Sequence, residues 1–243
     1  MEPINYGNIA DVYARNRPAN SFVVDELHKG CVLTSNSRVL EVGCGTGSHI
    51  LMLVQTTNCQ GWGIDPSEDM MCQEKSSGKV QFVSGTAEEL PFEDKFFDFL
   101  FSINVIHLVT STISYFHEAF RVLKPAGTIC TVTDSEKIIR NRKPLSQYWP
   151  GTISVDIKRY PTITTLKKQM MAVGFADVTE TNIQNTSQIE DITPYKEKAF
   201  SCLHLISQDE FLRGLARLQE DLKAGPIQRV SAYVCLWGRS PTL

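Results

Sequence analysis

The sequence predicts an α/β fold in which helices cover both faces of a mostly parallel, doubly wound sheet. The prediction starts from an apolar and largely β-branched run, Val39–Val42, which is typical of a buried strand. Glycines follow at alternate positions (Gly43, Gly45 and Gly47), and residues 49–54 form an apolar helical segment directly after them. A strand, a glycine turn and a helix in this order open the nucleotide-binding half of such a sheet.

The spacing of the glycines distinguishes between two kinds of cofactor. A dinucleotide fingerprint has the order G-x-G-x-x-G, whereas here the sixth position is Ser48 and the third glycine comes one residue early. The next apolar segment, Gly61–Ile64, ends at Asp65, whose two carboxylate oxygens can accept hydrogen bonds from two ribose hydroxyls. The glycine triplet alone is equally consistent with a structural turn. Together, the strand, the triplet, the helix and the acid favour a nucleotide-type cofactor, and the glycine order argues against NAD(P).

Two segments, Glu41–Gly47 and Asp65–Met71, resemble motifs of the class I S-adenosylmethionine-dependent methyltransferases. Within that family they are similar to the small-molecule group that includes the ubiquinone-biosynthesis methyltransferases, and the resemblance extends from about Tyr6 to Val178. It implies a Rossmann-like sheet of seven strands with the last strand antiparallel. It also implies S-adenosyl-L-methionine as cofactor, S-adenosyl-L-homocysteine as product, and in-line transfer of a methyl group to a small-molecule acceptor at O, N or C.

The length of 243 residues is sufficient for one α/β domain with a large core, and we expect a single methyltransferase domain over residues 1–243. Its expected parts are an N-terminal helical cap (1–35), a cofactor-binding core (36–183), a helical insertion (184–228) and the last strand (229–243). The insertion is predicted to be either a lid over the acceptor or a packing cover for a sheet edge.

The resemblance also implies which residues bind the cofactor. The set is Tyr13, Arg17, Glu41, Gly43, Cys44, Gly45, Gly47, Asp65, Pro66, Met70, Thr86, Ala87, Glu88, Ser102, Ile103 and His107. Met70 offers an apolar wall to the adenine in this interpretation. Thr86 departs from the family, in which an aspartate at this position accepts a hydrogen bond from the adenine amino group. The threonine hydroxyl can accept that hydrogen bond too, but it carries no charge. Cys44 is expected to serve the turn through its small size rather than through thiol chemistry.

Three residues are candidates for catalysis: His107, Tyr6 and Tyr13. His107 follows the fourth predicted strand, at the sheet edge where ligands gather, and a histidine there can accept a proton from the acceptor. The alternative for His107 is packing beside the methionine part of the cofactor. The alternative for both tyrosines is packing of a surface helix onto the sheet.

The remaining elements follow from periodicity and turn residues. One or two helices are predicted between Tyr6 and Leu33, the second with Ser21 as its N-cap. The other predicted strands are Val80–Val83, Phe96–Ser102, Thr128–Thr133, Phe175–Glu180 and Val230–Trp237. The other predicted helices are Ser114–Leu123, Thr164–Val173, Tyr195–Leu205 and Gln208–Leu222, and a tight turn is predicted at Lys124–Gly127.

Residues 134–162 show no clear periodicity, and they are predicted to be either an acceptor-binding loop or a surface crossover. In the first interpretation Tyr148, Trp149 and Tyr160 form an aromatic wall for the acceptor. Lys124 is interpreted as a solvated surface charge. Asp98 lies inside a predicted strand and is therefore interpreted as structural.

Composition limits the partners of the protein. The net charge of −3 gives no electrostatic reason to expect nucleic acid, and the most apolar stretch, residues 96–109, is too short and too polar for membrane insertion. Seven cysteines without a C-x-x-C pair, and a polar N-terminus, favour a cytoplasmic protein. The five histidines are dispersed, so no metal is expected. The expected partner is a small-molecule acceptor, which the aromatic residues of the segment 134–162 allow to be aromatic. The sequence does not indicate the oligomeric state.

Two other functions remain consistent with these residues. One is a non-catalytic S-adenosylmethionine-binding module, which would have the same binding residues. The other is an NAD(P)-dependent oxidoreductase, which the glycine order disfavours.

Overall fold

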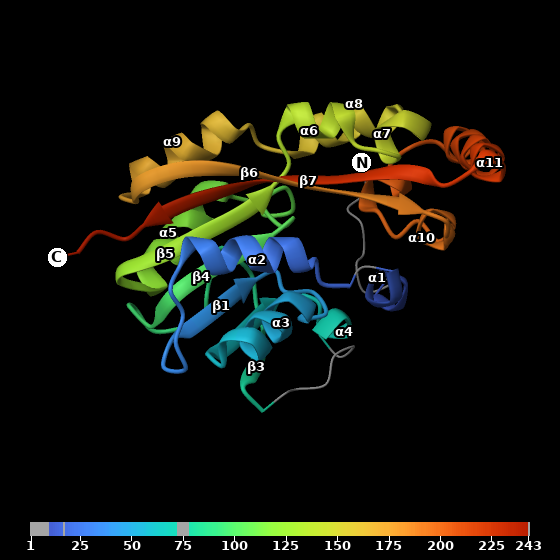
Figure 1. The fold of residues 1–243 in the computed structure, drawn as a ribbon. Helices are drawn as coiled ribbons and strands as arrows, with labels where there is room; N and C mark the ends of the chain where they lie inside the picture. The colour runs from blue at the N-terminus through green and yellow to red at the C-terminus, as the bar shows by residue number, and fades with distance from the viewer. Residues whose placement is uncertain (1–9, 17, 72–77, 243) are drawn as a thin grey trace.

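The computed structural model describes residues 10–16, 18–71 and 78–242, so Tyr6 and Arg17, two of the predicted site residues, lie outside the described residues. Within these ranges seven strands form one sheet in the order β3-β2-β1-β4-β5-β7-β6 (Figure 1). The strands are β1 (Arg38–Val42), β2 (Gln60–Asp65), β3 (Val80–Ser84), β4 (Phe97–Ile103), β5 (Leu123–Thr133), β6 (Ala176–Ile189) and β7 (Ile227–Arg239).

The pairing of the strands confirms the predicted sheet. Neighbours from β3 to β5 pair in parallel, whereas β7 runs antiparallel to both β5 and β6. From β1 the chain steps outward to β2 and β3 on one side, and β4 and β5 lie on the other. The strand order therefore reverses between β1 and β4, and ligands of open α/β sheets bind outside the carboxyl ends of the strands at such a reversal.

Alternating side chains of the central strands supply a core on each face of the sheet. Val39 and Phe99 pack with α2 (Ser21–Gly30) and α3 (Ser48–Thr57) on one face. Leu40 and Leu100 pack with α5 (Thr112–Val122) and α9 (Ile163–Val173) on the other face (Figure 1). This period of two is the pattern of a strand buried on both sides, and it confirms the predicted helices on both faces.

Two short helices, α1 (Ala10–Asn16) and α4 (Glu68–Met71), lie near the strand ends and contact each other.

The N-cap of α2 differs from the prediction. The residue that precedes α2 is Asn20, so Ser21 is the first residue of that helix rather than its N-cap.

The junction between α5 and β5 differs in detail from the prediction. The side chain of Ser111 accepts a hydrogen bond from the Ser114 N–H and caps α5, which ends at Val122. β5 begins at the next residue, and the predicted turn at Lys124–Gly127 is an irregularity within this strand, where its pairing with β4 shifts register.

Lys124 is not a solvated surface charge, and this part of the sequence interpretation is wrong. Its Nζ lies 2.8 Å from both carboxylate oxygens of Asp98. Asp98 also accepts a hydrogen bond from the Arg38 N–H at 2.8 Å, so it joins the start of β1 to the start of β5. The structural interpretation of Asp98 agrees with these contacts.

The segment between β5 and α9 is helical rather than irregular. It contains α6 (Glu136–Asn141), α7 (Leu145–Tyr148) and α8 (Gly151–Arg159). Pro144 and Pro150 directly precede α7 and α8, and they divide the segment into helices too short to show a periodic apolar stripe.

Strands β6 and β7 are longer than predicted and form a ribbon that extends past the other strands (Figure 1). The helical insertion, predicted from residue 184, begins only after Ile189. It contains α10 (Thr193–Lys196), a 3-10 turn η2 (Ser201–His204) and α11 (Gln208–Ala224), so the single helix predicted at residues 195–205 is wrong. Most side chains of β6 are exposed, and a strand without a buried face shows no apolar alternation in its sequence.

A third apolar cluster, here called the distal cluster, lies between the end of the ribbon, α7 and α11. Its buried members are Leu145, Tyr148, Trp149, Ile189, Ile192, Tyr195, Cys202, Leu203, Phe211, Leu218 and Ile227. No helix in the described part of the chain is long and apolar enough to cross a membrane.

We expect the Leu218→Ala substitution to lower the free energy of unfolding by about 2–5 kcal/mol, because Leu218 is fully buried in the distal cluster and its truncation leaves a cavity. The matched control is Leu212→Ala on the same helix, where the side chain is 53% exposed and the expected change is within about 0.5 kcal/mol. Urea denaturation measures both values. Equal effects of the two substitutions would contradict the packing of α11 described here.

Candidate functional site

A cavity of about 610 Å³, here called the larger cavity, lies at the carboxyl ends of β1, β2 and β4, beside the loop that follows β3. Its position is the reversal of strand order between β1 and β4. Its volume is within the range of small-molecule and cofactor sites.

The glycine turn after β1 supplies the floor of this cavity. The N–H groups of Gly43 and Cys44 both donate to the Ile64 carbonyl, at 2.8 and 3.0 Å, and this holds the turn against β2. Gly43 has φ +66°, and a Cβ there would lie 2.4 Å from the side chain of Val105. Only glycine fits both the backbone conformation and the close approach.

Glu41 is buried beneath the turn and acts as the cap that α3 otherwise lacks. Gly47 precedes α3 and has no side chain to offer, whereas Glu41 Oε2 accepts the Ile50 N–H at 2.9 Å. Burial raises the pKa of Glu41 well above its ordinary value, and the hydrogen bond from Ile50 opposes that rise.

Asp65 ends β2 and holds the same turn from the other side. Its Oδ2 accepts the Gly45 N–H at 2.8 Å, and its Oδ1 accepts the Ser67 N–H at 2.9 Å. Burial raises the pKa of Asp65, and these two hydrogen bonds oppose the rise. A carboxylate has about four lone-pair positions, so each oxygen of Asp65 can accept one further hydrogen bond.

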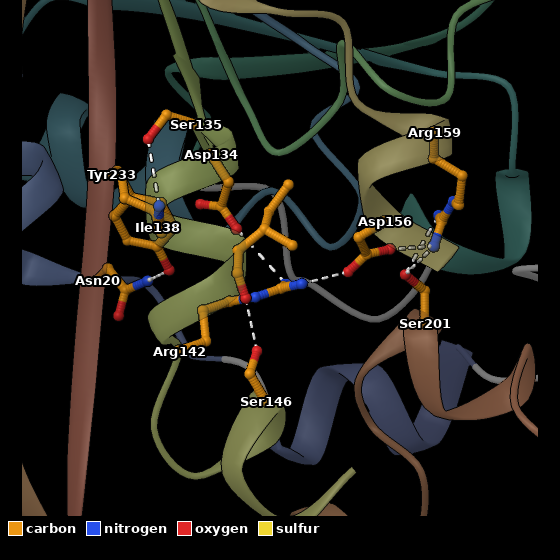
Figure 2. A network of polar contacts seen from close by, with 11 residues as sticks. Asn20, Asp134, Ser135, Ile138, Arg142, Ser146, Asp156, Arg159, Ser201 and Tyr233 are labelled. Atoms are coloured by element: carbon orange, nitrogen blue, oxygen red, sulfur yellow. Dashed lines mark hydrogen bonds and ion pairs between the residues drawn. The ribbon is translucent and has the colours of Figure 1, made fainter. Parts of the chain in front are cut away.

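His49 connects the turn to the N-terminal helices, and sequence reasoning missed it. Its Nε2 accepts the backbone N–H of Asn20 at 3.1 Å, which places the ring proton on Nδ1, 3.7 Å from Glu41 Oε1. The amide of Asn20 also donates to the hydroxyl of Tyr233 at 3.2 Å, on β7 (Figure 2). Both His49 and Asn20 line the larger cavity.

The loop after β3 forms the opposite wall of the larger cavity. Glu88 Oε1 accepts the N–H groups of Thr110 and Ser111, at 2.5 and 3.3 Å, and thereby joins this wall to the loop after β4. Arg121 supports the same wall from α5, because its guanidinium donates to the carbonyls of Leu90 and Phe92.

Most of the predicted cofactor residues come together at the larger cavity. Those that line it are Tyr13, Glu41, Gly43, Cys44, Gly45, Asp65, Pro66, Met70, Thr86, Ala87, Glu88, Ile103 and His107. Two predicted residues do not line it. Gly47 faces Phe82, where a Cβ would lie 2.4 Å from the ring, and Ser102 is buried and accepts a hydrogen bond from the Tyr115 hydroxyl at 3.0 Å.

Asn104 is a further lining residue that is not in the predicted cofactor-binding set. It follows β4 directly, has φ +56°, and lines both the larger cavity and its neighbour. Its buried side-chain oxygen has no hydrogen-bond partner among the described residues. A polar residue in a left-handed conformation at the end of a strand is the signal that could have indicated it, but φ cannot be read from the sequence.

A smaller cavity of about 200 Å³ adjoins the larger one on the side of β5, β6 and β7. The residues common to both linings are Tyr13, Pro18, Asn20, Asn104, His107 and Leu108. His107 therefore lies where the cavities meet, and its ring stacks on Tyr160 with centroids 4.0 Å apart.

Of the three residues of the predicted aromatic wall, only Tyr160 lines the smaller cavity. Tyr148 and Trp149 are buried in the distal cluster instead. Their polar atoms are occupied there, since the Tyr148 hydroxyl donates to Asp221 and the Trp149 indole donates to the Phe211 carbonyl.

A chain of polar contacts borders the smaller cavity (Figure 2). Arg142 Nη2 donates to Asp156 Oδ2 at 2.5 Å, and Arg142 Nη1 lies 3.5 Å from Asp134 Oδ2. The other oxygen of Asp156 accepts a hydrogen bond from Arg159 at 3.0 Å, and Arg159 also reaches the hydroxyl of Ser201. These residues come from the end of β5, from α6, from α8 and from η2, so the chain exists only in the folded protein.

Metal-ligand spacing and the Cys44 thiol are the two other chemistries that the sequence raises. No three His, Cys, Asp or Glu residues there lie close enough to hold a metal ion. Burial raises the pKa of the Cys44 thiol, so this residue is a neutral part of the turn.

Residues 40–131 match a family model described as a methyltransferase domain. A demethylmenaquinone methyltransferase of Staphylococcus epidermidis is 30% identical over 202 residues, which cover 71% of this chain and 84% of the relative. A tRNA U34 carboxymethyltransferase of Idiomarina loihiensis is 25% identical over 169 residues, which cover 65% of this chain and 50% of that protein. The chain spans about half or less of the length of several curated relatives that it matches.

Among solved structures, a protein named as a methyltransferase from an antibiotic biosynthesis pathway of Anabaena variabilis has the same fold. Its TM-score is 0.74 at 20% identity, over 92% of this chain and 98% of that chain.

We expect the Glu41→Gln substitution to change how stability depends on pH. Because the pKa of Glu41 is raised in the folded chain, the folded state keeps its proton where the unfolded state has lost it. The free energy of unfolding of the wild type therefore falls as pH rises above about the ordinary pKa of 4.5, and glutamine removes this contribution. The free energy of unfolding of Glu41→Gln, relative to that of the wild type, should therefore rise by up to about 1.4 kcal/mol for each unit of increasing pH.

Urea denaturation between pH 5 and 8 measures this difference. The control is Glu220→Gln, an exposed acid on α11, which should give the same pH dependence as the wild type. A constant difference between Glu41→Gln and the wild type across this range would show that Glu41 titrates alike in the folded and unfolded states.

Proposed function

Because this chain belongs to the class I S-adenosylmethionine-dependent methyltransferases, we propose that its larger cavity binds S-adenosylmethionine and that its smaller cavity receives the methyl acceptor. The observation that carries this proposal is the position of His107 and Asn104 at the boundary between the two cavities. A transfer reaction needs its two reactants to meet, and this boundary is the place where they can do so.

The residues of the larger cavity fit the cofactor. The two free acceptor positions of Asp65 suit the two hydroxyls of a ribose. The turn from Gly43 to Gly45 exposes backbone without side chains, and Met70 lies against it, since a Cβ on Gly45 would be 3.2 Å from its methyl group. Thr86 and Ala87 line the wall assigned to the adenine.

S-adenosylmethionine supplies an electrophilic methyl group on its sulfonium when it is bound. The contribution of the chain is then to hold both reactants, to exclude water and to align the acceptor, and such positioning contributes on the order of 7–11 kcal/mol in favourable cases. We propose that His107 accepts the proton of an acceptor that must lose one, with Tyr160 fixing the plane of its ring. Tyr13 lines both cavities and is the second candidate for this role.

The acceptor is proposed to be a small molecule. The relatives named above as acting on demethylmenaquinone and on tRNA U34 differ greatly in acceptor size. The smaller cavity, at about 200 Å³, has room for a compact head group but not for a nucleic acid, and the net charge of −3 does not favour a polyanion. We also propose the cytoplasm as its location, supported by seven cysteines in the sequence without a C-x-x-C pair.

We expect Asp65→Asn to weaken the binding of S-adenosylhomocysteine by about tenfold to a hundredfold, because the amide loses one acceptor oxygen and its charge. Isothermal titration calorimetry measures this, with Asp94→Asn as the control, since Asp94 is a surface acid paired with Arg121. The wild type should bind S-adenosylmethionine and its product but not NAD. Unchanged affinity in Asp65→Asn would refute the ribose assignment, and binding of NAD alone would refute the proposed cofactor.

We expect His107→Gln to lower the turnover number by about a hundredfold or more and to remove the acidic limb of the pH–rate profile, if the imidazole accepts a proton. Transfer of labelled methyl groups to a small-molecule extract provides the assay. The control is His117→Gln, an exposed histidine on α5. An unaltered pH profile in His107→Gln would assign His107 to packing only.

A further inference from the structure

The guanidinium of Arg142 is poorly satisfied by the protein itself. It carries five N–H donors, and the described residues engage it through one hydrogen bond, from Nη2 to Asp156. The contact of Nη1 with Asp134 is an ion pair at 3.5 Å, and the buried Nε has no hydrogen-bond partner. Nε is too enclosed for a ligand to reach, whereas the N–H groups of Nη1, which make no hydrogen bond to the described residues, can bind a group that arrives with a ligand.

The surroundings of Arg142 form a cavity rather than packed core. Arg142 lines the smaller cavity together with Asn104, whose side-chain oxygen is also without a partner among the described residues. Part of the wall is apolar or aromatic, from Leu145, Tyr195 and Phe200. The cavity thus combines an apolar wall with unused polar groups at one side.

The charges that line this cavity balance, because three cations (Arg142, Lys143 and Arg229) are matched by three anions (Asp134, Asp156 and Asp191). Asp156 is shared between Arg142 and Arg159, and Asp134 lies 3.5 Å from Arg142. An anionic acceptor is therefore favoured not by net charge but by the N–H groups of Arg142 that lack a hydrogen bond and by the sulfonium of the proposed cofactor.

We propose that the smaller cavity is the binding site for a small acceptor with an apolar body and a carboxylate, and that Arg142 binds this carboxylate. This assignment rests on the proposed methyltransferase function of the adjoining cavity. The planar guanidinium fork matches a carboxylate through paired hydrogen bonds, which a lysine at the same place would not reproduce. Arg142 is thereby a specificity-determining residue that keeps the body of the acceptor near His107.

The test uses benzoate as the probe, titrated calorimetrically into the full chain saturated with S-adenosylhomocysteine. Its comparators are benzamide, which is neutral, and benzylamine, which is cationic. We expect saturable binding of benzoate that is at least about tenfold tighter than that of either comparator. We expect Arg142→Gln to weaken benzoate binding by at least about tenfold, which corresponds to about 1.4 kcal/mol.

The matched control is Arg140→Gln, because Arg140 lies in the last turn of α6, two residues before Arg142, is exposed and pairs with Glu136. It should bind benzoate as the wild type does. Both variants should bind S-adenosylhomocysteine with unchanged affinity, which shows that they are folded and that the larger cavity is intact. If Arg142→Gln does not fold, the test uses Arg142→Lys, which should also bind benzoate more weakly than the wild type does. The preference of the wild type for benzoate over the two comparators is then the second measurement.

Several results would overturn this assignment. They are wild-type affinity for benzoate in Arg142→Gln, equal or tighter binding of benzamide or benzylamine, and no benzoate binding by a wild type that binds S-adenosylhomocysteine. Failure of the wild type to bind S-adenosylhomocysteine would instead contradict the proposed function, so the two failures are distinguishable.

Discussion

One buried hydrogen bond, from the Ile50 N–H to the carboxyl group of Glu41, ties the start of α3 to β1 beneath the turn that forms the floor of the larger cavity. Gly47 allows the chain to turn but cannot cap α3, so a side chain from β1 must satisfy the start of that helix. The oxygen of Glu41 can accept this bond whether or not the carboxyl group is protonated, which suits a buried group whose pKa is raised. With Asp65 holding Gly45 from β2, two adjacent strands secure the turn from both sides.

The sequence predicts the part of the site that is built from contiguous residues. Val39–Val42, the glycine turn and Asp65 lie close together in the sequence, and their spacing alone predicts a strand, a turn and a helix. These elements lie as predicted. Asn20 and Arg142 escape such reasoning because their roles arise from contacts between distant segments, with His49 in one case and Asp156 in the other. Asparagine and arginine are also common on protein surfaces, so the residue type alone did not indicate a role for either of them.

Each misassigned residue or element has its own physical reason. Ser102 and Ile103 are neighbours on β4, but successive side chains of a strand face opposite ways, so only one of them lines the larger cavity. Trp149 was placed near the acceptor because aromatic residues beside prolines suggest a binding loop, yet a fully buried indole stabilises the distal cluster instead. The polar sequence of β6 hid the part of this strand beyond Glu180, because a strand whose side chains are mostly exposed needs no apolar alternation.

The overhang of the ribbon has a consequence for how such a protein can diversify. β5 pairs with β7 only over residues 234–239, whereas β6 and β7 continue together to Ile189 and Ile227, and the tip carries α10 and α11 (Figure 1). Exchange of residues 190–226 would rebuild a wall of the smaller cavity while the register of the central sheet stays the same. Of the described residues that line the larger cavity, only Leu205 belongs to this segment, so the smaller cavity can change by recombination at the tip of a single hairpin while the glycine turn and Asp65 stay the same.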